Sequence, residues 1–210
     1  MALFRRTQSL PVPPRPSESR GETFKSLGLK ALFELLATDR KYSILDLGPA
    51  IGANIEFLSR FSSKLRVENL FETLTRGKFF GLDEELVDQS LVSRIISIPP
   101  GECFDVVLSW DLVNYFKPAE LKPLIRYLET FCAQGAFFFI MGATGKEIPT
   151  APTTFKLVDA ETLLYTAGSA EVRPCPRYAP RDLSLLMSGF RVQSSYILQN
   201  GMQEYVFVHA

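Results

Sequence analysis

The clearest change of hydrophobic period along the chain lies within residues 42–61. Ile44 and Leu45 form a short apolar run that ends at Asp46, as expected of a buried strand. A turn over residues 47–53 follows, and beyond it apolar residues recur at helical spacing, at Ile55, Phe57, Leu58 and Phe61. The pattern predicts a strand, a tight glycine-containing turn and a helix.

The rest of the chain alternates between short apolar runs and stretches of helical period. Further helices are expected over residues 23–37, 82–94, 118–131 and 181–189. Further strands are expected over residues 64–72, 95–98, 104–108, 136–141, 190–198 and 204–209. The Asn200-Gly201 step between the last two strands is typical of a tight hairpin. The long connection 142–170 carries one short predicted helix, at 160–165, and we interpret it as a substrate lid.

Composition favours one globular domain over residues 23–210. Of the 210 residues, 46% are hydrophobic, which is enough for a well-filled core, and 23 basic residues balance 23 acidic ones. This balance argues against a broad basic surface for nucleic acid. Residues 1–22 are rich in proline and arginine, so we expect a disordered leader. Its Pro-Val-Pro-Pro-Arg-Pro segment could serve a weak SH3-type partner.

Other composition signals argue against metal binding and membrane insertion. The three cysteines, Cys103, Cys132 and Cys175, are far apart in sequence and are expected to be reduced thiols, while the lone histidine is His209. We therefore expect no metal site. The longest apolar run, residues 135–143, has the length of a strand and not of a membrane span. Without a secretory signal, the chain is expected to be cytoplasmic.

The glycine turn has the geometry of a ligand-binding device. Glycines let a ligand approach the backbone, and a helix N-terminus offers unpaired N–H groups. The turn resembles the first motif of the class I S-adenosylmethionine-dependent methyltransferases, in which an acidic residue at a strand end precedes G-x-G-x-G. Here Asp46 is followed by Gly48, Ala50 and Gly52, with alanine at the middle glycine position. The nicotinamide-type G-x-G-x-x-G fingerprint fits less well, because its third glycine is missing.

A second motif follows about 58 residues later, in the stretch Phe-Asp-Val-Val-Leu-Ser-Trp-Asp of residues 104–111. It resembles the fourth strand of the same family, whose following loop borders the methyl group and the acceptor. The resemblance implies that Ser109 and Trp110 bind cofactor and that Asp111 and Tyr115 are catalytic. Trp110 could hold a sulfonium by cation–π attraction, and Asp111 could orient or deprotonate the acceptor. The alternatives are that Trp110 is a core aromatic and that Asp111 caps a helix beginning near residue 112.

The resemblance also implies acidic residues that bind the nucleoside of the cofactor. An acid at the end of the second strand accepts hydrogen bonds from the ribose hydroxyls in this family. Glu72 is the favoured candidate and Glu68 the competing one, which we expect to lie in mid-strand. For the acid that contacts adenine after the third strand, the sequence offers only Glu102.

Taken together, the two motifs imply an α/β fold for nearly the whole chain. The expected architecture is a single doubly wound, mostly parallel sheet of seven strands, with helices on both faces and a C-terminal antiparallel hairpin. The implied function is methyl transfer from S-adenosyl-L-methionine to a small-molecule or protein acceptor. A non-catalytic binding or regulatory relative with a degenerate cofactor loop is the alternative. A different nucleotide-binding α/β enzyme is a third interpretation, from the glycine turn alone.

Overall fold

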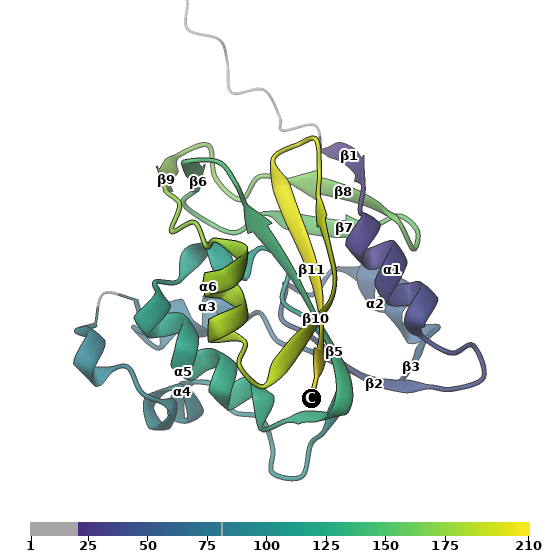
Figure 1. Cartoon of the computed structure of the whole chain (residues 1–210), viewed down its shortest axis with the longest axis horizontal. Coiled ribbons are helices and arrows are strands. Elements are labelled where there is room, and N and C mark those ends of the chain that lie inside the picture. Colours follow the sequence, from purple (N-terminus) through teal and green to yellow (C-terminus); the bar gives the residue numbers. More distant parts are fainter. Residues whose placement is uncertain (1–20, 81) are drawn as a thin grey trace, which may run out of the picture.

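A mixed sheet of six strands forms the centre of this computed structural model, which describes residues 21–80 and 82–210. The strands lie in the order β10, β11, β5, β4, β2, β3 (Figure 1). In that order they span Phe190–Ile197, Met202–His209, Cys132–Ala143, Phe104–Leu108, Tyr42–Asp46 and Ser62–Val67. The last four are mutually parallel, whereas β11 is antiparallel to both of its neighbours. The carboxyl ends of β2, β3 and β4 therefore lie at one edge.

Helices cover both faces of this sheet (Figure 1). One face carries α1 and α2, which span Leu27–Leu35 and Gly52–Ser59. The other carries α3, α4, α5 and α6, which span Leu70–Arg76, Gln89–Ile95, Pro118–Glu129 and Pro180–Leu186. Two short 3-10 helices, η1 and η2, span Glu84–Leu86 and Leu112–Tyr115.

The central strands are apolar on both faces because helices cover each side. Leu45 and Val107 belong to the core cluster with α3 to α6. Their neighbours Ile44 and Val106 belong to the cluster with α1 and α2. Continuous apolar runs such as that of β4 were therefore correctly interpreted as buried strands.

The predicted seventh strand, residues 95–98, is absent from the sheet. Ile95 ends α4, and the segment after it approaches β3 through a side chain: Arg66 Nη2 donates to the carbonyl oxygen of Ser97 at 2.8 Å. Two prolines follow at once, and proline has no N–H for a ladder. The prediction of a single seven-stranded sheet is therefore wrong, because this strand is missing and the sheet has six strands.

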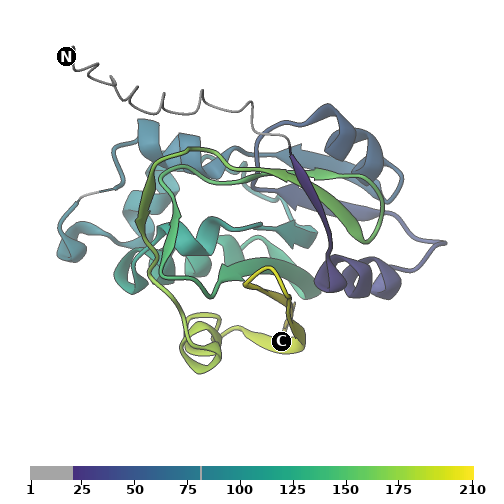
Figure 2. The ribbon, with the colours of Figure 1, turned by 90° about the horizontal axis from the view of Figure 1, so that it is seen from above.

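Two small antiparallel sheets lie beside the central one. The first joins β1, β8 and β7, spanning Glu22–Lys25, Thr162–Thr166 and Thr154–Leu157. The second joins β6 and β9, spanning Glu147–Pro149 and Val172–Pro174. Figure 2 shows the first sheet, in purple and green, on the near side of the molecule seen from above. The helix predicted at 160–165 is wrong: Leu163 packs into the core from a strand, and the alternation of this segment suits a half-buried strand.

Other predicted boundaries shift for local reasons. The helix expected from residue 23 begins at Leu27, because residues 22–25 pair with β8 instead. The helix expected over 82–94 is reduced to η1 and α4, because Asp88 accepts from the backbone N–H of Leu91 at 2.7 Å and starts a new helix. The predicted leader falls almost entirely outside the described residues.

Several predictions are confirmed closely. They include β2, β4, α5 and the terminal β10–β11 hairpin, whose turn contains Gly201 with a φ of 78°. Among the described helices, none is long and apolar enough to cross a membrane.

Candidate functional site

The candidate site lies at the carboxyl edge of β3, β2 and β4. Backbone hydrogen bonds continue past the strand ends: the N–H of Glu68 donates to Asp46 O at 2.7 Å, and that of Leu47 donates to Leu108 O at 2.9 Å. These bonds hold the glycine turn between the segments that follow β3 and β4. The two motifs therefore meet at one edge of the sheet, as predicted.

Asp46 organises the base of the glycine turn. Its carboxylate is buried, and Oδ1 accepts from the backbone N–H of Gly48 at 2.9 Å and from Trp110 Nε1 at 2.6 Å. Burial raises the pKa of Asp46 to about 6, and the two hydrogen bonds oppose that rise. The side chain thus fixes both the turn and the indole ring.

Trp110 fills the inner part of the crevice. A Cβ added at Gly48 would lie 2.8 Å from Trp110 Nε1, so the glycine is needed for close approach of the indole. The ring is stacked on Phe155 of β7, with centroids 5.8 Å apart and planes at 12°. Trp110 also has a φ of 52°, in the left-handed region that a residue with a Cβ adopts at a cost. The core-aromatic interpretation of Trp110 is the one that matches its surroundings.

Strand β7 is held over the crevice by Asn54, in the first turn of α2. Asn54 is buried; its Nδ2 donates to Phe155 O at 2.8 Å and its Oδ1 accepts from the N–H of Leu157 at 2.8 Å. Just before β7, the N–H of Thr153 donates to Asp111 Oδ2 at 3.1 Å. The side chains of Asn54 and Asp111 therefore hold the backbone of β7 and of the residue before it.

Little space remains between these groups. The cavity bounded by Gly48, Asn54, Trp110, Asp111 and Phe155 has a volume of about 20 Å³. A water molecule needs about 10–15 Å³ by the same kind of measure, whereas small-molecule sites usually enclose roughly 300–1,000 Å³. In this conformation the crevice therefore does not fit a nucleoside-sized cofactor.

The outer half of the turn is open. Ala50 and Gly52 are exposed, and a Cβ added at Gly52 would meet no atom within 4 Å. The residue that precedes α2, Ile51, provides no side-chain cap. The first N–H groups of this helix are therefore available to an anionic group from solvent.

The predicted strand-end position of Glu72 is wrong. Glu72 lies in α3, 48% of its side chain is exposed, and it pairs with Arg76 and accepts from Asn69 Nδ2. The error has a simple cause: β3 ends at Val67, so apolar residues that we assigned to the strand are the buried side of α3.

Glu68, the competing candidate, directly follows β3 at the site edge and not in mid-strand. Its Oε1 accepts from Thr73 Oγ1 at 2.8 Å, its Oε2 lies 3.5 Å from Arg66 Nη2, and 20% of the side chain is exposed. Of the two glutamates, Glu68 is the one that lies at the carboxyl edge of the sheet.

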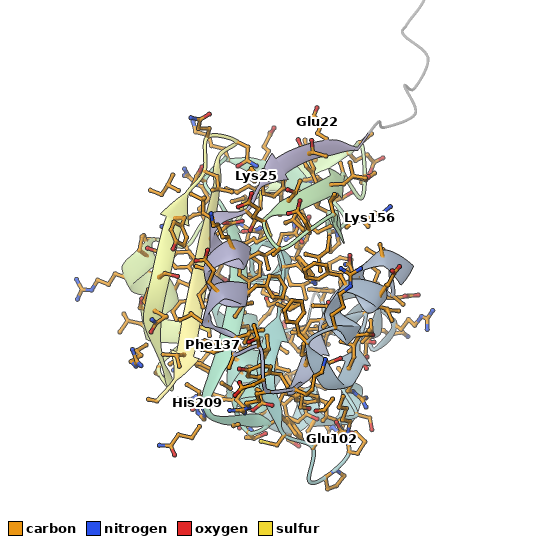
Figure 3. The ribbon with its side chains drawn as sticks, turned by 90° about the vertical axis from the view of Figure 1, so that its right-hand side faces the viewer. Glu22, Lys25, Glu102, Phe137, Lys156 and His209 are labelled. Carbon is orange, nitrogen blue, oxygen red and sulfur yellow. The ribbon has the colours of Figure 1, made fainter. Side chains whose placement is uncertain are left out.

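Glu102 lies at the wrong end of the sheet for an adenine contact. It precedes the start of β4 and pairs with Lys64 at 2.7 Å. Figure 3 shows it at the end of the molecule opposite to Lys156 of β7. Among the residues that the structure describes, the acid that the resemblance implies after the third strand has no counterpart.

Asp111 is the buried carboxyl of the site. Only its Oδ2 has a partner among the described residues; Oδ1 is buried and unpaired, and burial raises the pKa to about 7. The side chain does not cap η2, so the capping alternative is wrong.

The two remaining predicted residues have structural contacts. Tyr115 is buried and its hydroxyl donates to Ala151 O at 3.0 Å, while burial raises the pKa of its phenol. Ser109 is buried and its N–H donates to Phe139 O at 3.0 Å. Sequence reasoning missed Asn54 and Phe155. For Asn54, the sequence shows only that a polar residue stands near the start of the predicted helix. That position does not identify a partner about a hundred residues further along the chain.

Comparison with known proteins extends this picture. No protein-family model matches the chain. No curated protein matches it either. The structure is similar to the PH0226 protein from Pyrococcus horikoshii OT3, with a TM-score of 0.51 and 13% identity over 87% of this chain and 88% of that one. It is also similar to an S-adenosylmethionine dependent methyltransferase from Mesorhizobium loti, with a TM-score of 0.51 and 12% identity over 85% of this chain and 96% of the other. The chain has the fold of the class I S-adenosylmethionine-dependent methyltransferases.

Proposed function

We propose that this protein is an S-adenosyl-L-methionine-dependent methyltransferase whose cofactor crevice is closed in the present conformation. The observation that carries the proposal is the grouping at one sheet edge of an open glycine turn, an uncapped helix N-terminus and Glu68. These are the groups that a cofactor with a carboxylate and a ribose requires.

Different residues of the chain suit different parts of the cofactor and the acceptor. The N–H groups at the start of α2 suit the carboxylate of the cofactor, and Glu68 suits the ribose hydroxyls. The bound cofactor would supply an electrophilic methyl group. Asp111, with a pKa of about 7, can hold or release a proton near neutral pH, which suits it to take a proton from the acceptor. The acceptor, small molecule or protein, stays unassigned.

Cofactor entry requires that the Trp110–Phe155 pair move. Loss of an aromatic stack costs about 0.5–1.5 kcal/mol beyond lost burial, and the bond from Trp110 to Asp46 adds to this. Any affinity is reduced by the fraction of molecules that are open. We therefore expect weaker binding than in an open site.

A second candidate function rests on the same closure. If the crevice never opens, the protein is a non-catalytic relative. Trp110 and β7 then occupy the space that a ligand would otherwise take. The 20 Å³ cavity and the short bond between Trp110 and Asp46 favour this alternative.

Calorimetric titration with S-adenosylmethionine and S-adenosylhomocysteine separates the two. The proteins to compare are the wild type, Phe155→Ala to open the crevice, and Phe33→Ala as a control for loss of a buried aromatic in the same cluster. The methyltransferase proposal expects saturable wild-type binding that Phe155→Ala tightens and Phe33→Ala does not. Absence of heat up to millimolar ligand in all three would leave the non-catalytic function.

A further inference from the structure

A larger cavity lies on the other side of η2. Its volume is about 510 Å³, within the range of small-molecule sites. The ends of β5 and η2, the start of β11 and the segment leading into α6 form its walls, and none of its lining residues also lines the 20 Å³ crevice. It is therefore a separate site.

Two of the polar side chains around the cavity are already hydrogen-bonded to the protein. Asn114 Nδ2 donates to Met141 O at 3.3 Å, and its Oδ1 accepts from the N–H of Ala143 at 2.8 Å. Tyr178 donates its hydroxyl hydrogen to Phe116 O at 2.6 Å. These bonds hold the walls of the cavity in place.

Tyr205 of β11 also lines the cavity. The residue is only 3% exposed, and its buried hydroxyl has no hydrogen-bond partner among the described residues. A buried hydroxyl left unpaired is unfavourable, because it has lost its hydrogen bonds to water. Burial also raises the pKa of this phenol, so it stays neutral and able to donate. Because the hydroxyl is not exposed to the cavity, a polar atom of a ligand would satisfy it after a small movement of the ring.

The charged residue that lines the cavity is basic. Arg177 lines it, is exposed, and forms no ion pair with any residue of the described ranges. Burial raises the pKa of the Cys175 thiol, and the charges of Arg177 and Arg173 oppose that rise, although Arg173 is not a lining residue. No lining residue is acidic. The cavity therefore favours an anion.

Apolar residues, with Val113, Ala143 and Leu183 among them, form part of the remaining wall. We propose that this cavity binds a small carboxylic acid with an apolar body, with Arg177 pairing with the carboxylate and the Tyr205 hydroxyl bonding to the ligand. The site does not depend on methyl transfer, because it uses neither the glycine turn nor Asp111.

The test uses 4-fluorophenylacetate as probe and the neutral 4-fluorophenylacetamide as its matched control, followed by ¹⁹F NMR on the full chain. We expect the acid to bind at least tenfold more tightly than the amide, since a charge-assisted pair is lost. Arg177→Gln should remove this preference, whereas Arg181→Gln, on the exposed start of α6, should keep it.

Tyr205→Phe provides a second measurement. It should weaken binding of the acid by about two- to tenfold while leaving the melting temperature equal or higher, because an unpaired buried hydroxyl is removed. Equal binding of acid and amide, no binding of either at millimolar concentration, or full affinity in Arg177→Gln would each overturn the proposal. S-adenosylmethionine titration is scored separately, so either proposal can fail without the other.

Discussion

Gly48 has a different role here from the one that the motif implied. In the family motif this glycine lets the cofactor approach, whereas here it makes room for the indole of Trp110. In this protein the glycine therefore accommodates a side chain of the protein itself instead of a ligand. This difference can be tested with two glycine variants of one turn.

Gly48→Ala should destabilise the protein by about 1–3 kcal/mol, because the new Cβ would meet Trp110 Nε1 at 2.8 Å and force a shift. Gly52→Ala is the matched control: its Cβ meets nothing within 4 Å, and alanine favours the helix, so stability should be unchanged or up to about 1 kcal/mol higher. Urea unfolding measures both. Equal effects of the two substitutions would contradict the assignment.

Asp111 should make stability depend on pH. Its pKa is raised from 3.8 to about 7 in the folded state, so between these values the folded protein holds a proton that the unfolded chain has released. Stability is therefore fully present below about pH 4 and falls as pH rises towards 7. Asp46, with a pKa raised to about 6, acts in the same direction.

We expect Asp111→Asn to gain stability relative to wild type as pH rises from 4 to 8, because the amide cannot ionise but can still accept from Thr153. Urea unfolding at several pH values checks this, with the surface substitution Asp83→Asn as control. A stability difference that stays constant over this range would show that Asp111 does not titrate as described.

At the scale of elements, the side chain of Asn54 hydrogen-bonds α2 to β7. Asn54→Ala leaves the carbonyl of Phe155 and the N–H of Leu157 without their partner, so it should cost about 2–4 kcal/mol and loosen β7. Hydrogen exchange gives the local readout: the Leu157 amide should lose protection. Asn69→Ala, whose amide contacts only exposed Glu72, is the control. Unchanged protection at Leu157 would refute the anchoring role.

Elements that depend on local pattern were predictable, and those that depend on distant pairing were not. The β2 turn, β4, α5 and the last hairpin each carry their signal within a few residues. By contrast, β1 becomes a strand because Glu22 to Lys25 pair with residues 162–165, far along the chain. The same holds for the site: Asp46 and Trp110 were found from motifs, whereas the contact of Asn54 with Phe155 spans 101 positions.

At the scale of the whole molecule, a buried hydrogen bond connects the N-terminal helix, α1, to the last strand, β11. Glu204 of β11 is buried, and its Oε2 accepts from the N–H of Gly28 in α1 at 2.7 Å. A Cβ at Gly28 would lie 2.9 Å from both Glu204 Cβ and Phe139 Cε2. The approach of α1 to the sheet therefore requires a glycine.

Gly28→Ala should for this reason destabilise the protein by about 1–3 kcal/mol, although alanine is the better helix former. Thermal unfolding of this variant beside Ala31→Gly, which lowers helix propensity in α1 without the clash, separates the two effects. A more stable Gly28→Ala protein would mean that α1 has room to move away from the sheet.

The stacking of Trp110 on Phe155 has a spectroscopic consequence. The chain contains one tryptophan, and its indole is buried in the crevice, so its fluorescence reports on that position alone. Opening would expose the indole to water and shift its emission to longer wavelength. Titration with S-adenosylmethionine should produce this red shift in parallel with the calorimetric signal, whereas a carboxylate bound beyond η2 should leave the spectrum unchanged. Cofactor binding with a constant spectrum would place the ligand outside the crevice.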